Sequence, residues 1–207
     1  MSPTLIAAPV PRADDDEAGD EELDQETPSA PADGSGDGHC EIIDGVRVEL
    51  PPMSADSAVF ATYLTYEINA VSVPAGVGAA HAEVMFQLPL SQDRRRRPDV
   101  AFVPYSRWPR RRPVPRQAAW EVLPDLCVEV ISPTDRAEDV RGKTDEYFRA
   151  GVRLVWVVYP NLELVDVYES AGQCRTLRRA DALDGGVVLP GFRVELATLF
   201  PEPEVAS

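Results

Sequence analysis

The sequence predicts an α/β fold in which helices flank a mixed central sheet, with a β-rich C-terminal part and a disordered acidic N-terminal tail. Two nearly continuous apolar runs, 126–131 and 154–158, have the length and composition of strands that are buried on both faces. A helical segment separates them, which gives a strand, helix, strand unit. Short strand-like runs divided by glycine turns then follow to residue 196.

The negative charge of the chain is concentrated in the predicted tail. The formal net charge is −15, and residues 1–40 contain eleven acidic residues against one arginine. This segment is also rich in Pro, Gly, Ser and Ala, so it buries too little apolar surface to offset the entropy lost on ordering. We therefore expect it to be disordered and solvated, although an acidic arm that mimics nucleic acid and shields a basic groove is an alternative.

A chain of 207 residues usually forms a single domain. We place that domain at 41–200 and a short C-terminal tail at 201–207. Cys40, Cys127 and Cys174 form neither a CxxC pair nor an even framework, which favours reduced thiols. No basic residue precedes the apolar run 5–10, and no apolar stretch approaches the roughly 20 residues of a membrane span. The sequence thus predicts a cytoplasmic protein without a membrane partner.

A hairpin and a helix are predicted ahead of the central unit. Residues 41–50 read as two short strands about the turn Asp44-Gly45. Ser54 or Asp56 can then cap a helix that runs to about residue 71. Glu67 falls in the middle of its apolar face, where a carboxylate is either bonded by a neighbour or serves as an outer acidic contact of a site. The apolar residues of that face are Val59, Phe60, Tyr63, Leu64, Ala70 and Val71.

Further strands and turns follow from apolar runs and from glycine and proline. Strands are expected at 82–90, 98–103, 163–168, 174–179 and 187–196, and a loop rich in proline and arginine at 104–116. A helix at 139–150 should end at Gly151, which is well suited to a left-handed C-terminal cap.

Two carboxylates lie on apolar strands. Asp99 follows Pro98 at the mouth of the strand 98–103, and Glu129 lies inside the strand 126–131. An uncompensated buried charge costs several kcal/mol, so Glu129 requires a cation, a proton or several hydrogen-bond donors. Both a functional role and a structural ion pair satisfy that requirement.

Lys143 is the only lysine of the chain. It falls at the edge of the apolar stripe of helix 139–150, where its stem can pack and its ammonium can reach a carboxylate. An ammonium shifts its pKa more readily than a guanidinium and so suits proton chemistry better. An ordinary surface lysine is the alternative. The buried stripe is expected to contain Val140, Thr144, Tyr147 and Phe148, and the solvent face Arg141, Asp145, Glu146 and Arg149.

The order and spacing of several short motifs resemble the Uma-type restriction endonucleases of the PD-(D/E)XK nuclease superfamily. Each motif alone is weak, but together they are fairly specific and cover about residues 41–200. The resemblance implies a restriction-endonuclease-like sheet. The motifs are Glu41-Ile-Ile-Asp44-Gly45, Pro98-Asp99-Val-Ala-Phe-Val, Val128-Glu129-Val-Ile-Ser132-Pro133, Lys143-x-x-x-Tyr147, Ala150-Gly151-Val and Leu189-Pro190-Gly191-Phe192.

The resemblance implies a set of catalytic residues. In that superfamily the two acids of the motif hold Mg²⁺, so Asp99 and Glu129 are expected to bind Mg²⁺ or Mn²⁺, with the main-chain carbonyl of Val130 as a third ligand. Ile131 stands where the superfamily has its lysine, and the role is expected to pass to Lys143 on the following helix.

Three further positions bear on the resemblance. Glu41 matches the family's early glutamate and could add an outer acidic contact. Tyr159 stands where the family usually has aspartate, and Ser57 stands where it often has histidine. Neither departure affects the three central residues.

The implied activity is metal-dependent hydrolysis of DNA phosphodiester bonds by an endonuclease. Residues 94–116 hold nine arginines and one acid, which suits phosphate binding, although pairing with the acidic tail is the alternative. A second hypothesis is a catalytically silent nuclease fold that binds nucleic acid or protein, and a homodimer is left open. The arginines expected at the DNA backbone are Arg94, Arg95, Arg96, Arg97, Arg110, Arg111 and Arg112.

Other chemistries lack their residues in this sequence. His39 and His81 are the only histidines, so histidine-rich zinc sites lack ligands. No P-loop or GxGxxG fingerprint precedes a helix. A serine hydrolase would have only His81 as its base.

Overall fold

The computed structural model of the chain describes residues 39–117 and 119–200. The predicted C-terminal tail lies outside these residues, and so does the predicted N-terminal tail except for its last two residues. Those two are His39 and Cys40, and Cys40 is the first residue of strand β1 and is 1% exposed. The folded part therefore begins slightly earlier than the sequence suggested.

A mixed six-stranded sheet forms the centre of the fold, as predicted, with the order β10-β9-β8-β7-β6-β3. β7 and β8 are parallel neighbours, and the helix α2 (Ala137–Ala150) connects them, while the other pairs are antiparallel. The strands are β3 (Gly78–Ala82), β6 (Val100–Pro104), β7 (Leu126–Val130), β8 (Leu154–Tyr159), β9 (Leu164–Ser170) and β10 (Gln173–Arg178).

A second, antiparallel sheet has the order β2-β1-β5-β4. It contains the predicted hairpin, whose turn residues Asp44 and Gly45 have φ of 54° and 78°. The prediction of a single strand at 82–90 is wrong. The chain turns at Glu83, with φ of 57°, and passes from β3 of the central sheet to β4 of the second sheet. The strands are β1 (Cys40–Ile43), β2 (Val46–Glu49), β4 (Phe86–Leu88) and β5 (Arg94–Arg96).

Strand β5 and strand β11 (Ala182–Gly185) were not expected from the sequence. A run of arginines reads as exposed loop, and the glycine pair that ends β11 reads as a turn. β11 pairs with β12 (Leu189–Glu195), which is followed by the short helix α3 (Leu196–Leu199), and the single turn η1 (Pro160–Leu162) joins β8 to β9.

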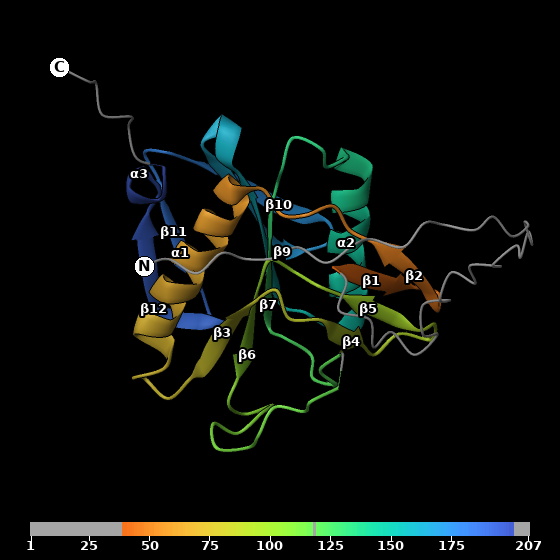
Figure 1. Ribbon diagram of the computed structural model, residues 1–207. Helices are drawn as coiled ribbons and strands as arrows, with labels where there is room; N and C mark the ends of the chain where they lie inside the picture. The colour runs from red at the N-terminus through yellow and green to blue at the C-terminus, as the bar shows by residue number, and fades with distance from the viewer. Residues whose placement is uncertain (1–38, 118, 201–207) are drawn as a thin grey trace, which may run out of the picture. The chain divides into compact units, whose positions relative to one another are not determined.

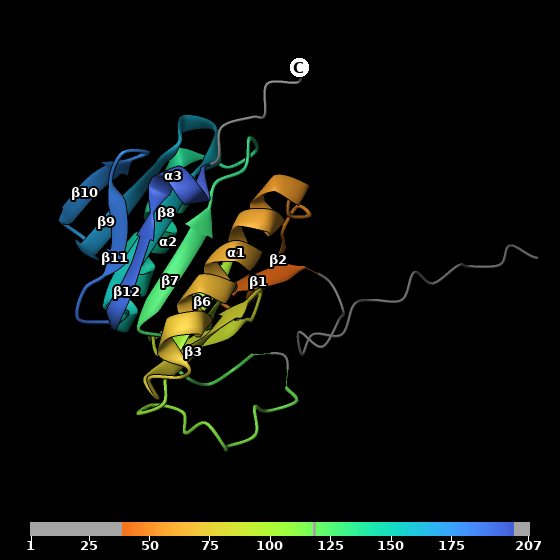
Figure 2. The same ribbon diagram turned by 90° about the vertical axis from the view of Figure 1, so that its left-hand side faces the viewer.

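The two long helices cover opposite faces of the central sheet. α1 (Ala55–Ser72) and the β11–β12 pair lie on one face, and α2 lies on the other beside the second sheet (Figures 1 and 2). On the first face Leu64 and Ile68 pack against Phe102 of β6. On the second face Tyr147 of α2 packs with Cys127 and other strand residues. Among the described residues, no helix is long and apolar enough to cross a membrane.

Helix α1 begins where the sequence predicts, because Ser54 Oγ accepts a hydrogen bond from the Ser57 N–H at 3.1 Å. The predicted buried face is right in part, because Leu64 is buried and Phe60 and Tyr63 pack against the core, but it is wrong for Val59, which is 67% exposed. Small side chains at the true interface bring the helix close to the sheet, where Asn69 bonds both polar groups of the Ala80 backbone on the edge strand β3. The buried residues of α1 are Ser57, Ala61, Leu64, Ile68 and Ser72.

Candidate active site

The C-terminal end of α2 is fixed by Gly151, as predicted. Its φ of 97° is left-handed, and its N–H bonds to the carbonyls of Tyr147 and Phe148. Thr144 and Tyr147 are buried, as expected, but the expectation that Glu146 faces solvent is wrong, because it is 8% exposed. The helix therefore presents both an acid and the edge residue Lys143 to the interior.

The structure brings Asp99, Glu129 and Lys143 together at one pocket with a volume of about 90 Å³. β6 and β7 are antiparallel, with Val100 opposite Val128, so the residue before β6 lies next to the C-terminal end of β7. α2 follows β7 and returns over this end of the sheet.

Glu129 is held by two side chains of α2. The Tyr147 hydroxyl donates to Oε1 at 2.6 Å, and Lys143 Nζ donates to Oε2 at 3.2 Å. Burial raises the pKa of the Glu129 carboxyl, while Lys143 and the tyrosine hydrogen bond act in the opposite direction. Both oxygens thus have donors, and their positions are set by a single helix.

Asp99 accepts a hydrogen bond from the Val130 N–H on Oδ2. Burial, together with the nearby charge of Glu129, raises the pKa of Asp99 to about 8. Negative charge is therefore crowded at this point, with no fully compensating cation among the described residues.

Lys143 lies between two carboxylates. Its Nζ is 3.2 Å from Glu129 Oε2 and 3.4 Å from Glu41 Oε1. Burial alone would lower the pKa of Lys143, but the two acids outweigh it and raise that pKa above its ordinary value. The side chain is therefore a charged ammonium at neutral pH.

Glu41 lies where the sequence suggested an outer acidic contact, and it is 1% exposed. Oε1 accepts the Arg97 N–H at 3.0 Å, and Oε2 accepts Arg96 Nη1 at 2.6 Å. Burial would raise its pKa, but Lys143 and Arg96 lower the pKa of Glu41 below its ordinary value. Glu41 is ionised and connects Lys143 to the arginines of β5.

Two of the arginines expected at the DNA backbone are buried, so that expectation is wrong for Arg94 and Arg96, which are 8% and 6% exposed. Glu146 bonds Arg94 Nη1 at 2.8 Å and Arg96 Nε at 2.7 Å, and Asp44 bonds Arg94 Nη2 at 2.8 Å. These residues form an ion network that leads from the half-exposed Asp44, through buried arginines and Glu146, to Glu41 and Lys143.

The neighbouring arginines are more exposed than those of the network. Arg95 pairs with Asp93 at 3.1 Å, and Arg97 lines the pocket while Nη1 donates to the Glu83 carbonyl at 2.7 Å. Arg110, Arg111 and Arg112 are exposed on the loop after β6, as their predicted role requires.

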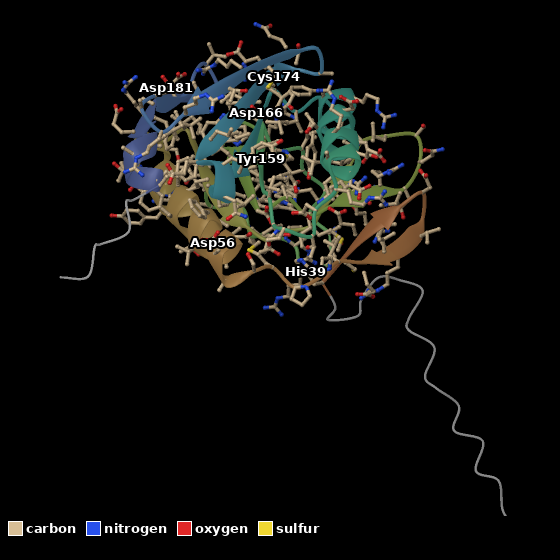
Figure 3. The ribbon with its side chains drawn as sticks, turned by 90° about the horizontal axis from the view of Figure 1, so that it is seen from above. His39, Asp56, Tyr159, Asp166, Cys174 and Asp181 are labelled. Atoms are coloured by element: carbon tan, nitrogen blue, oxygen red, sulfur yellow. The ribbon has the colours of Figure 1, made fainter. Side chains whose placement is uncertain are left out.

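Two residues of this region were not found from the sequence. The Glu83 carboxyl lies against that of Asp99, and Glu83 Oε1 is buried without a hydrogen-bond donor among the described residues. His39 Nδ1 is 3.4 Å from Glu83 Oε2, and Figure 3 shows His39 between the first hairpin and α1. Glu83 follows a strand and His39 ends an acidic segment. No sequence motif or periodicity marked either residue as part of a site.

Glu67 is not part of this site. It hydrogen-bonds Tyr63 on the same helix and does not line the pocket. The alternative of a carboxylate bonded by a neighbour is therefore the correct one, and the outer acidic contact is wrong for Glu67. Tyr159 hydrogen-bonds Asp166 on β9, away from His39 in Figure 3. Ser57 does line the pocket, and its hydroxyl is 2.8 Å from that of Ser54.

The oxygen atoms at the pocket are of the type that binds a hard divalent cation. In the described part of the chain, no group of three or more His, Cys, Asp and Glu side chains is placed to hold a metal. Asp99 and Glu129 nevertheless offer carboxylate oxygens beside the main chain of Val130, which are the ligand types that Mg²⁺ accepts along with water. Burial and the nearby Glu129 raise the pKa of Asp99 and so disfavour its ionised form, and a bound cation would favour that form.

The fold and the site together define a nuclease-like α/β protein. The chain is similar to the crystal structure of a protein described as a putative nuclease belonging to DUF820 from Anabaena variabilis ATCC 29413. The TM-score is 0.69 at 19% sequence identity, and the match covers 78% of this chain and 89% of that chain. At that identity the likeness shows the fold.

The chain belongs to the Uma2 family, whose description is "Putative restriction endonuclease" and whose model matches residues 23–198. The family membership inferred from the motifs is thereby confirmed. The comparison with curated proteins found no match.

Proposed function

We propose that this protein is an endonuclease that hydrolyses DNA phosphodiester bonds with Mg²⁺ or Mn²⁺ as its cofactor. The observation that carries the proposal is the position of Lys143, whose Nζ lies 3.2 Å from Glu129 in the pocket that Asp99 also lines. The superfamily's lysine is absent at Ile131, and α2 supplies an ammonium to the same acid. Membership of the Uma2 family supports this assignment.

Asp99, Glu129 and the Val130 carbonyl are the groups that would hold the metal. When bound, a divalent ion polarises the phosphoryl oxygen and lowers the pKa of its water. The short hydrogen bonds from Tyr147 to Glu129 and from the Val130 N–H to Asp99 fix the carboxylates beforehand, which keeps the reorganisation cost low.

Lys143 acts as a charged group in this proposal. Its raised pKa favours an ammonium that orients the attacking water and stabilises charge on the phosphate over a lysine that removes a proton. Glu41 also holds this ammonium, with its Oε1 at 3.4 Å from Nζ.

DNA is the substrate that the exposed arginines suit. Arg97 reaches the pocket itself, and Arg110 and Arg111 on the loop after β6 are exposed. Contacts of this kind neutralise phosphates without reading sequence, so we expect binding that weakens as salt rises.

The test is cleavage of supercoiled plasmid with and without divalent metal, using Asp99→Asn, Glu129→Gln and Lys143→Ala. We expect Mg²⁺- or Mn²⁺-dependent nicking that each substitution reduces by about 10²-fold or more, because each removes a group at the reacting centre. Glu138→Gln is the matched control, since Glu138 is an exposed acid on the same helix as Lys143. It should cleave as the unchanged protein does.

Folding of each variant is checked by circular dichroism before its activity is compared. Cleavage that survives in all three folded variants would contradict the proposal. Salt-sensitive DNA binding without any turnover in the unchanged protein would instead support the silent nuclease-fold module.

A further inference from the structure

A second pocket lies on the loop side of β3 and β6. Residues 105–117 and 119–125 lie between β6 and β7, and Trp120 forms a bridge there with Phe86 of β4, the edge strand of the second sheet. The pocket has a volume of about 120 Å³. We call it the tryptophan pocket, and its principal residues are His81, Tyr105, Trp108, Arg110, Arg112 and Trp120.

Aromatic rings at right angles shape this pocket. The rings of Trp108 and Trp120 are 5.3 Å apart at 90°, and those of His81 and Trp120 are 5.2 Å apart at 80°. Trp120 also stacks on Phe86 at 5.7 Å, which anchors it in the core. Trp108 and His81 are partly exposed, and they flank the buried indole of Trp120, which is 4% exposed.

Cationic side chains adjoin these rings. The Arg112 guanidinium lies 3.7 Å above the Trp108 ring, and Trp108 Nε1 donates to the Arg112 carbonyl at 3.1 Å. Arg110 and Arg111 are exposed, and neither pairs with a carboxylate in the parts of the chain that the structure describes. By contrast, Arg107 is paired with Asp125 at 2.7 Å. Arg110 and Arg112 thus line the tryptophan pocket without a carboxylate partner among the described residues.

The tryptophan pocket lies within reach of the candidate active site along one strand. Asp99 directly precedes β6, and Val103 of β6 lines the tryptophan pocket. Four residues of strand span about 13 Å, which corresponds to about four base-pair steps of duplex DNA. Alternation along a strand puts Asp99, Ala101 and Val103 on the same side, so the two pockets lie on the same side of β6.

We propose that the tryptophan pocket takes an unstacked base of the nucleic acid bound at the active site. This inference rests on the proposed nuclease function and adds a feature of the substrate, namely a single-stranded, frayed or mismatched segment a few nucleotides from the cut. Bases stack on tryptophan and arginine planes whatever their sequence, and the adjoining arginines contact the flanking phosphates.

The size and polarity of the pocket agree with a base. Its volume of about 120 Å³ is well below the roughly 300–1,000 Å³ of pockets that enclose drug-sized ligands, so a single planar ring system suits it better. Burial lowers the pKa of His81, which leaves a neutral imidazole with one donor and one acceptor for the edge of a base.

The test measures binding of a labelled single-stranded oligonucleotide and of the blunt duplex of the same sequence, using the full chain with EDTA present so that no cleavage occurs. Trp108→Ala should weaken single-strand binding by about 5- to 100-fold, because one stacked base contributes about 1–3 kcal/mol. It should change duplex binding much less, and Trp108→Phe should restore most of the affinity. Tyr66→Ala is the matched control, since Tyr66 is an aromatic residue on α1 that is 68% exposed and lies outside the pocket.

Salt dependence separates stacking from charge. Arg111→Ala should reduce the slope of log K against log salt by about one unit or less, because it removes at most one phosphate contact. Trp108→Ala should leave that slope unchanged while lowering the affinity.

The inference is overturned if Trp108→Ala binds the single strand normally, if it weakens single strand and duplex equally, or if the protein binds no nucleic acid. Failure of the proposed function is distinguishable. If plasmid cleavage is absent but single-strand binding depends on Trp108, the result contradicts the proposed nuclease function and supports the tryptophan pocket. If cleavage needs Asp99 but Trp108 variants bind normally, only the tryptophan pocket is misassigned.

Discussion

Single residues set the charge of the site, and the largest effects on stability are expected from the buried ones. Glu146 is shared between Arg94 and Arg96, and Arg96 in turn holds Glu41, which is one of the two acids beside Lys143. An arginine pair in the interior is tolerable only with this acid between them. The same bonds that satisfy buried charge also fix the position of the ammonium.

We predict that Glu146→Gln lowers the free energy of unfolding by about 3–5 kcal/mol, because it leaves two buried guanidinium groups without their shared counter-charge. Urea denaturation followed by circular dichroism measures this. Glu195→Gln is the matched control, since the Arg193–Glu195 pair is 65% and 58% exposed and should change stability by no more than about 0.5 kcal/mol. Equal effects of the two substitutions would show that the network carries no special share of stability.

At the scale of elements, α2 determines whether the site exists, because it supplies Lys143, Tyr147 and Glu146 to partners on β7, β1 and β5. Its direction depends on the left-handed cap at Gly151. The parallel pairing of β7 and β8 requires such a crossover helix, and that helix passes over the strand end that carries Glu129.

Two glycines of this helix should respond to alanine in opposite ways. Gly151→Ala should destabilise by about 1–2 kcal/mol, because its φ is +97° and an added Cβ would lie 3.3 Å from Leu123. Gly142→Ala should stabilise by about 0.5–1 kcal/mol, because this position is inside the helix and its Cβ would meet nothing within 4 Å. Thermal denaturation of both variants measures the difference, and the same sign for both would contradict it.

At the scale of the whole molecule, stability should depend on pH and on divalent metal together. Asp99 has an ordinary pKa of 3.8 when unfolded and about 8 when folded, so between these values the folded state holds a proton that the unfolded chain has released. In the metal-free protein this contribution to stability is therefore present at low pH and lost as pH rises. We expect it to amount to about 1–2 kcal/mol between about pH 5 and about pH 8, with allowance for partial screening.

Unfolding in EDTA across this pH range, compared between the unchanged protein and Asp99→Asn, isolates the contribution. The variant should lack this part of the pH dependence and should be the more stable protein at about pH 8. Mg²⁺ or Mn²⁺ should stabilise the unchanged protein more at the higher pH, because the metal binds the ionised carboxylates. A parallel pH dependence of the two proteins would exclude Asp99 as its source.

The sequence alone determined the features that depend on local rules. The Asp44-Gly45 turn, the Ser54 cap, the Gly151 cap and the two buried strands around α2 all follow from backbone preferences and continuous apolar runs. The motif order identified the family, and the apolar runs placed Asp99 at the start of one strand and Glu129 inside the next. The helical periodicity of 139–150 placed Lys143 at the edge of the apolar stripe. From that position its ammonium was expected to reach a carboxylate.

Only the tertiary structure decided which charged residues are buried and what they contact. Arg94, Arg96 and Glu146 look like surface residues in one dimension, because burial of a charge becomes tolerable only when partners from distant strands converge on it. Glu83 joined the site through a turn between two sheets, and Trp108 met Trp120 through a loop that no periodicity describes. Such contacts depend on pairing over long sequence separations, which local pattern does not encode.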